Sequence, residues 1–290
     1  MNISYLLVIS AAALWGAIGL FSKIGGHTGF LPMEICFIRS AFAVILLGIF
    51  FAVTDRKIFK LEKITDLKYF IGTGILSFSL NNWGYIEAIK ETSMGVAAIL
   101  LYTAPGIIMI ISAVLFHEKI TKIKLAALIM TFMGCVFVTG IIGTENVISV
   151  KGFVFGILSA VGYGLYSIFG KIALRKYSPI TVGFYTFVMS GLFFTAMINP
   201  ADTISKINET NSWIYVFSFA AFTSSVPYIL YTKGLSGIEA TKASILANIE
   251  PVTAAVIGII VFSEPVNIFK ILGIAMVVGA VCMLNLSSEK

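Results

Sequence analysis

Ten runs of about twenty apolar residues, separated by short polar segments, dominate this sequence. A helix needs about 20 mostly apolar residues to cross the hydrocarbon core of a bilayer. The runs lack the alternation of polar and apolar residues that is typical of transmembrane strands. We therefore predict an all-α integral membrane protein with ten transmembrane helices. The expected spans are Ile3–Phe21, Leu31–Val53, Tyr69–Ile89, Met94–Phe116, Ile123–Ile142, Val150–Phe169, Ile180–Ile198, Trp213–Leu235, Thr241–Phe262 and Val266–Leu286.

The charged residues support a lipid environment. The chain is 58% hydrophobic and 12% charged, whereas a soluble protein of this size carries about 25% charged residues. Its net charge of +6 does not indicate a nucleic-acid partner, because the basic residues lie in the short segments between apolar runs. The expected partners are the lipid bilayer and a small-molecule substrate.

Lysine and arginine also predict the orientation, since cytoplasmic loops carry more of them. If the N-terminus is cytoplasmic, 14 of these residues lie on the cytoplasmic side and 5 on the other, with Arg39 inside a span. We therefore predict a multi-pass protein of the cell membrane with both termini cytoplasmic. The longest polar segments, 54–68 and 199–212, are expected to be loops.

The sequence contains an internal repeat. Pro105 and Pro251 are 146 positions apart, and so are Glu118 and Glu264. Repeats of this kind are the first feature to look for in a fold prediction. We divide the chain into a first repeat, 1–146, and a second repeat, 147–290.

Each repeat contains five predicted spans. Because five is odd, the second repeat must enter the membrane in the opposite direction to the first. Inverted repeats place a substrate site near the bilayer midplane and allow the halves to rock about it. A static structural duplication is the alternative.

Glu250 is the most informative polar residue, because it lies in mid-helix beside Pro251. An acid at this depth costs about 2.5–3.5 kcal/mol on insertion scales, so it must face protein or water. Each proline, Pro105 and Pro251, is expected to break its helix and free a carbonyl a turn earlier. An acid beside a freed carbonyl suits an ammonium group or a proton. A structural polar partner for Glu250 is the other interpretation.

Arg39 is the natural counter-charge within the membrane. Arginine forms bidentate pairs with carboxylates, so it can bind a substrate carboxylate or pair with Glu250 or Glu34. Extension of its charged end toward the membrane surface is the third alternative. Amide and aromatic side chains at similar depth either bond neighbouring helices or line a cavity. The predicted substrate-binding residues are Glu250, Asn248, Tyr102, Asn82, Trp15, Tyr163 and Arg39. We expect no catalytic residue, metal or cofactor.

The sequence resembles the drug/metabolite transporter superfamily, specifically its ten-helix EamA type. The resemblance rests on Ala-Leu-Trp-Gly at 13–16 followed by Lys23, and on Pro32 followed by Arg39. It also rests on a Pro, Phe, Glu and following Gly that occur twice, as Pro105, Phe116, Glu118 and Gly134 and as Pro251, Phe262, Glu264 and Gly279. It implies a transporter of amino acids, related metabolites or toxic compounds. The second half departs from the pattern, with Thr186 where the arginine would fall, which predicts an asymmetric site.

We therefore predict a secondary transporter that uses alternating access, with export of an amino acid or related zwitterion as the first choice. Organic cation or drug efflux and metabolite uptake are the alternatives, and an intramembrane enzyme or a channel is a remote one. No catalytic pair is present, so we expect no enzyme, and no Walker motif is present, so we expect no direct drive by ATP. The inverted repeat argues against a channel, which would show a ring of like residues or a filter loop. Proton coupling stays open. We expect a monomer, because ten helices can close a pathway within one chain.

Overall fold

The computed structural model describes residues 3–141 and 149–287. Every regular element in these two ranges is helical. The first range contains α1 (Ile3–Gly16), α2 (Ile18–Ile24), α3 (Pro32–Thr54), α4 (Leu67–Thr73), α5 (Leu80–Glu91), α6 (Met94–Leu101), α7 (Ala104–Leu115) and α8 (Lys122–Val138). The second contains α9 (Val150–Ala173), α10 (Pro179–Thr195), α11 (Pro200–Glu209), α12 (Trp213–Ala220), α13 (Val226–Gly237), α14 (Ala240–Ala247), α15 (Ile249–Phe262) and α16 (Ile268–Ser287). The π-helical turns η4 (Gly74–Ser79) and η5 (Ala221–Ser225) join α4 to α5 and α12 to α13.

Seven helical segments in the described residues are long and apolar enough to cross a membrane, or up to eight if a bent pair is counted as one span. The seven are Ile3–Ile24, Pro32–Thr54, Met94–Leu115, Val150–Ala173, Trp213–Gly237, Ala240–Phe262 and Ile268–Leu286. They coincide with seven of the ten predicted runs. The other three runs fall on α4–η4–α5, α8 and α10. Ile142, the predicted end of one run, and the predicted boundary at 146 lie outside the described residues.

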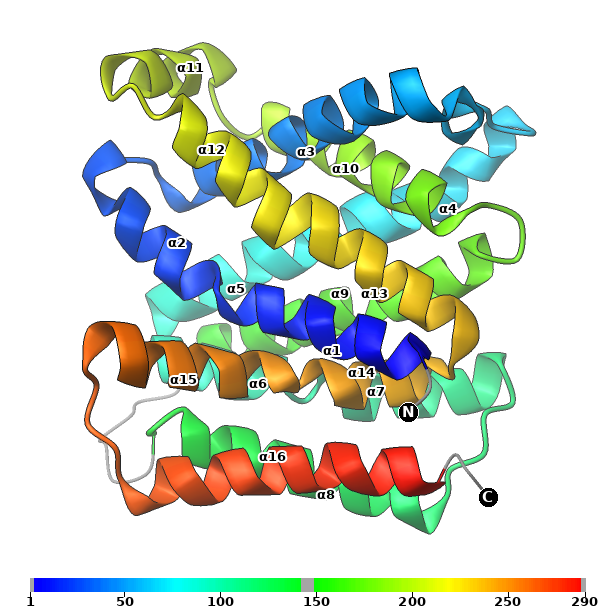
Figure 1. Cartoon of the computed structure of the whole chain (residues 1–290), viewed down its shortest axis with the longest axis vertical. Helices are drawn as coiled ribbons and strands as arrows, with labels where there is room; N and C mark the ends of the chain where they lie inside the picture. Colours follow the sequence, from blue (N-terminus) through cyan, green and yellow to red (C-terminus); the bar gives the residue numbers. More distant parts are fainter. Residues whose placement is uncertain (1–2, 142–148, 288–290) are drawn as a thin grey trace.

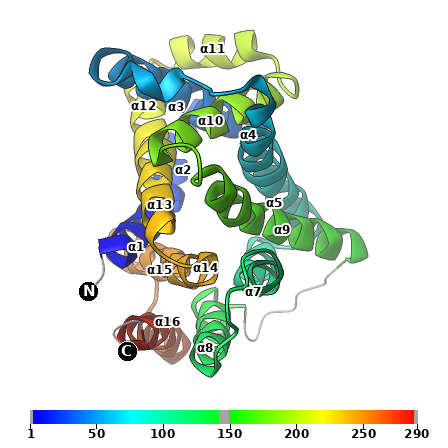
Figure 2. The same ribbon diagram turned by 90° about the vertical axis from the view of Figure 1, so that its right-hand side faces the viewer.

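The helices lie roughly along one direction, with loops at both ends (Figure 1). We call the side where α1 begins and α16 ends the termini side, and the opposite side the far side. α1 runs from the termini side to the far side, and α9 runs the other way (Figure 1). Viewed at right angles, α8 and α16 form one edge, α3, α10 and α11 form the other, and α9 lies between them (Figure 2).

The segment 199–212 was predicted to be a loop, and that prediction is wrong for most of its length. It contains α11, bent by 98° from α10. Pro200 occupies a position in the first turn, where its missing N–H costs nothing, and the Asn199 side chain accepts a hydrogen bond from Ala201 N. Thr203 and Ile207 lie on one helix face and are both buried.

Glycine allows close packing between α8 and α16, the last helices of the two repeats. A Cβ added at Gly134 of α8 would lie 2.8 Å from the carbonyl oxygen of Gly273 in α16. No side chain fits between the two backbones at that distance. α8 and α16 are therefore held together by backbone contact along the edge seen in Figure 2.

Two spans are interrupted at equivalent places. α6 ends at Leu101 and α7 begins at Ala104, with Pro105 in its first turn. α14 ends at Ala247 and α15 begins at Ile249, with Pro251 in its first turn. Because proline has no N–H, the carbonyl four residues earlier loses its usual helical donor. These two interruptions lie within the spans, where an unpaired backbone group needs protein or water to satisfy it.

Candidate functional site

The interruption between α14 and α15 packs directly against α1. A Cβ added at Gly16 would lie 2.6 Å from the carbonyl oxygen of Glu250 and 2.6 Å from Cβ of Thr253. Only a glycine allows this approach. Trp15, next to Gly16, is thereby fixed beside the first turn of α15.

Glu250 is half-buried in this turn. Within the described residues its carboxylate has no hydrogen-bond or ion-pair partner. It lies close enough to Tyr85, Tyr102 and Tyr163 to interact with them electrostatically. The structure therefore surrounds an acid with aromatic side chains, and the charge of Arg39 acts on it without forming an ion pair. A carboxylate in that setting attracts a cation, and tyrosine faces add to the attraction.

Two buried hydrogen-bond donors near this acid also have no partner among the described residues. They are Nε1 of Trp15, whose residue is 6% exposed, and Nδ2 of Asn248, whose residue is 3% exposed. Buried polar atoms in proteins are nearly always hydrogen-bonded, so exceptions are informative. Both donors suit an oxygen atom of a bound molecule.

An aromatic cavity lies beside Trp15. Its walls include the rings of Tyr163, Tyr228 and Tyr231, whose centroids lie 6.4, 5.1 and 5.3 Å from that of Trp15. Ser77, Asn81 and Ser167 add polar groups. The room inside is ≈ 10 Å³, about that of one water molecule. The cavity therefore has the composition of a binding site but is closed down in this conformation.

Arg39 binds neutral oxygen atoms of the protein. Its guanidinium donates to the Asn82 Oδ1 at 3.2 Å, the Thr223 carbonyl oxygen at 3.1 Å and the Ser224 Oγ at 3.3 Å. Neither Glu250 nor Glu34 forms an ion pair with it in the described part of the chain. Arg39 is 7% exposed, and η5 supplies two of its three acceptors. It therefore binds the π-helical turn.

Glu34 has a different cation. Lys206 of α11 donates to both carboxylate oxygens at 2.9 Å, and Thr203 contacts one of them. Glu34 also accepts from Leu31 N at 2.7 Å, which caps the start of α3. This acid is therefore a structural group that ties α3 to α11 on the far side.

The predicted site residues fall into two groups. Glu250, Tyr102, Tyr163 and Trp15 lie around the aromatic cavity and the start of α15, and Asn248 lies in the helix break. Asn82 lies with Arg39, and its neighbour Asn81 lines the cavity instead. Ser77 and Ser167 were not predicted, because a lone serine in an apolar run gives no signal in the sequence. The π-helical turn η4, which contains Ser77, has no sequence signature either.

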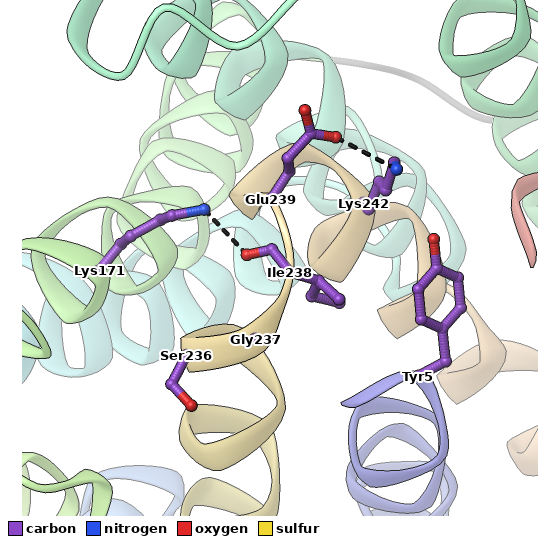
Figure 3. Close-up of a pocket in the computed structure, with 7 residues that line it drawn as sticks. All are labelled: Tyr5, Lys171, Ser236, Gly237, Ile238, Glu239 and Lys242. Carbon is purple, nitrogen blue, oxygen red and sulfur yellow. Dashed lines mark hydrogen bonds and ion pairs between the residues drawn. The ribbon is translucent and has the colours of Figure 1, made fainter. Parts of the chain in front are cut away.

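A second, larger hollow of ≈ 410 Å³ lies on the termini side (Figure 3). Its walls come from Tyr5 of α1, Lys171 of α9 and the segment from Ser236 to Lys242 that joins α13 to α14. Lys171 donates to the Ile238 carbonyl oxygen at 2.8 Å, and Lys242 pairs with Glu239 (Figure 3).

A chain with this many long apolar helices in its described residues is a multi-span membrane protein. Comparison with known sequences identifies the family. The chain belongs to the EamA-like transporter family, which matches residues 2–140 and 150–286. The two matches show two EamA repeats. The family and the names of the relatives indicate a transporter, which is not an enzyme.

Relatives agree with this assignment, and a solved structure agrees with the fold. An uncharacterized transporter of Archaeoglobus fulgidus is 28% identical over 94% of this chain and 93% of its own length. The uncharacterized transporter YxxF of Bacillus subtilis is 24% identical over 95% of this chain and 87% of its own length. A protein of known crystal structure superposes with a TM-score of 0.79 at 15% identity, covering 99% of this chain and 97% of that chain. That likeness shows the fold alone.

Proposed function

We propose that this protein is a secondary transporter that exports a small metabolite with a protonated amino group, most simply an amino acid, across the cell membrane by alternating access. The observation that carries the proposal is the Glu250 carboxylate, which has no partner in the described residues and faces aromatic side chains at membrane depth. A substrate ammonium group is the partner that this environment lacks. The unpartnered donors of Trp15 and Asn248 suit the substrate carboxylate.

The proposal includes ten spans. α8 and α10 have 17 residues each, the lower limit for crossing a bilayer. α4, η4 and α5 are continuous from Leu67 to Glu91, and polar residues within this run, Asn81 and Asn82 among them, make it less apolar than the others. With these three the count is ten, and both termini lie on one side (Figure 1). The lysine and arginine distribution makes that side cytoplasmic.

The proposal also includes two inverted halves. Its support is that α1 and α9, the first spans of the two EamA matches, run in opposite directions (Figure 1). The helix interruptions after Leu101 and Ala247 lie at matching positions of the halves. Interrupted helices at the interface of inverted repeats are where such carriers bind their cargo.

Organic cation efflux is the second candidate. Arg39, the strongest carboxylate ligand at this depth, already donates to three protein acceptors. The acid and the tyrosines, by contrast, suit a cation that carries no carboxylate. Competition between the two ligand classes separates these candidates.

Counterflow in liposomes tests the proposal. Vesicles preloaded with an unlabelled amino acid are expected to accumulate the labelled one, and a matching amine without a carboxylate is expected to compete poorly. Glu250→Gln is expected to abolish counterflow while the protein stays folded in the membrane. Glu87→Gln is the matched control, because Glu87 pairs with Lys90 at the surface. Full counterflow by Glu250→Gln would remove this acid from the site.

A further inference from the structure

The chain ends two equivalent helices in the same way. α7 and α15 are each followed by a residue in the left-handed conformation, His117 with φ 56° and Ser263 with φ 53°. The next residues, Glu118 and Glu264, each donate their backbone N–H to a carbonyl six residues earlier, at 3.3 and 3.1 Å. The two glutamates therefore leave their helices with the same backbone geometry. Their carboxylates nevertheless have different partners.

On the termini side Glu118 joins the two halves. Its carboxylate accepts from Ala240 N at 2.8 Å, from Thr241 N at 3.2 Å and Oγ1 at 2.7 Å, and from Lys171 Nζ at 3.2 Å. It thus caps α14, whose own N-cap residue, Glu239, provides no side-chain cap. Burial alone would raise the pKa of Glu118. The hydrogen bonds from Thr241 and Ala240 and the charge of Lys171 lower the pKa by more than burial raises it, so the pKa lies below its ordinary value.

On the far side the corresponding carboxylate stays within its own half. Glu264 pairs with Lys270 at 2.8 Å, and its side chain is 48% exposed, against 6% for Glu118. The corresponding lysine is nevertheless nearby. Lys23 lies over the ring of Phe262 at 3.7 Å, as Lys171 lies over Phe116 at 5.8 Å.

The start of α6 corresponds to the start of α14. Its cap is its own Ser93, whose hydroxyl accepts from Val96 N at 3.3 Å. Gly95 stands where α14 has Thr241. Among the described residues, a Cβ added at Gly95 would meet only Ile141, at 3.9 Å. A carboxylate can therefore approach the first backbone amides of α6, as Glu118 does at α14.

We propose that Glu118 and Glu264 are the acids of two matched gates. In this structure the termini-side acid binds the other half and the far-side acid binds its own half, and we assign these contacts to a closed and an open gate respectively. The far-side gate closes when Glu264 leaves Lys270 and binds Lys23 and the first amides of α6. Lys270 is then the residue that holds the far-side gate open. The inference rests on the proposed alternating access.

The two gates oppose each other because each joins one half to the other. When Glu118 leaves Lys171 and α14, its charge-assisted hydrogen bonds are lost, and this loss is offset when equivalent contacts form elsewhere. Glu264, Lys23 and α6 offer those contacts. If Glu264 and Lys270 are instead a permanent surface pair, the pair contributes little to stability. Removing either partner then has the same effect on the opening of the termini-side gate.

Thiol labelling tests the gates without any substrate. The reporter is Ser244→Cys in a Cys282→Ser background, because Ser244 is fully buried in α14, one turn below the Glu118 contacts. Glu118→Gln is expected to raise the maleimide labelling rate about tenfold, the change that about 1.4 kcal/mol produces. Lys171→Gln should act in the same direction and serves if Glu118→Gln does not fold. Glu87→Gln should leave the rate unchanged.

The decisive comparison uses this Glu118→Gln protein. Adding Glu264→Gln is expected to lower the labelling rate, because the far-side gate can no longer close. Adding Lys270→Gln is expected to raise it, because Glu264 is released toward Lys23. Equal or parallel effects of the two substitutions would overturn the gates in favour of a surface pair. Because labelling needs no cargo, opposite effects in a protein that moves no amino acid would leave the gates standing and refute the proposed substrate.

Discussion

Replacing Gly16 by alanine is expected to separate α1 from α15 at the candidate site. The added Cβ would lie 2.6 Å from the carbonyl oxygen of Glu250, whereas ordinary contacts begin at 3.4 Å. The two backbones must therefore move apart by about 0.8 Å, from 2.6 to 3.4 Å. Neither obstacle is a flexible side-chain end, so the whole turn must shift. Trp15 and Glu250 move relative to each other as a result.

The magnitude follows from packing. Overfilling a tightly packed contact costs about 1–3 kcal/mol, while alanine gains about 0.5–1 kcal/mol over glycine inside a helix. Gly19→Ala on α2 is the matched control, because a Cβ at Gly19 meets nothing within 4 Å in the described part of the chain. The control receives the propensity gain without the clash. The difference between the two variants is therefore the clash alone, about 1–3 kcal/mol, or about 5–150-fold in an equilibrium.

Two measurements check this prediction. Thermal unfolding in detergent is expected to show Gly16→Ala melting below Gly19→Ala, and counterflow in liposomes is expected to fall at least fivefold for Gly16→Ala only. If both variants melt and transport alike, the close approach of α1 and α15 is wrong. If stability falls but transport does not, the contact is real and does not position the site.

Two further predictions concern groups outside and inside the spans. Hydrogen bonds from Lys176 and Tyr177 lower the pKa of Asp66 below its ordinary value of 3.8. The ionised Asp66 therefore stabilises the fold at pH values above 3.8, and this stabilisation is lost as the pH falls through the pKa of the folded state. Melting temperatures from pH 7 to 3 should therefore fall at the acid end, and Asp66→Asn should flatten that fall. Arg39→Lys keeps the charge but loses the three-acceptor fork, so we expect lower stability and transport, and transport equal to the parent protein would contradict a positioning role.

The sequence predicts the spans well, because a run of apolar residues needs only length and hydropathy to be recognised. Seven predicted runs coincide with spans of the described structure. The prediction that 199–212 is a loop failed at α11. The polar composition of this segment indicated a loop, and an amphipathic pattern only ten residues long was too short to indicate a helix against it. Pro200 after Asn199 was the available clue to a helix start.

The candidate site is harder to predict, because it depends on how helices are rotated against one another. Depth can be counted along the chain, and it placed Arg39 and Glu250 in mid-membrane. Rotation cannot be counted, and it decides that Arg39 contacts η5. The partner also includes the Thr223 backbone carbonyl in a π-helical turn, a feature without a sequence signature.

The two halves agree in backbone and differ in polar side chains. The turns η4 and η5 begin at Gly74 and Ala221, 147 positions apart. Each turn region is contacted by the second span of the other half. In one case the contact is Thr186 Oγ1 to Thr73 Oγ1 at 2.7 Å, and in the other it is the long Arg39 side chain.

Under the proposed inversion this division has a physical reason. Two conformations of similar energy need halves whose backbones can exchange roles, so the helix ends, interruptions and π-helical turns are duplicated. A small substrate has different chemical groups at its two ends, so the side chains that bind it cannot be duplicated. Glu250 and Asn248 accordingly stand where the first half has Ala104 and Tyr102. Replacing Ala104 by glutamate would restore the symmetry and place a second acid opposite Glu250. We expect that variant to lose transport of a zwitterion, because the carboxylate of the substrate would then meet a like charge.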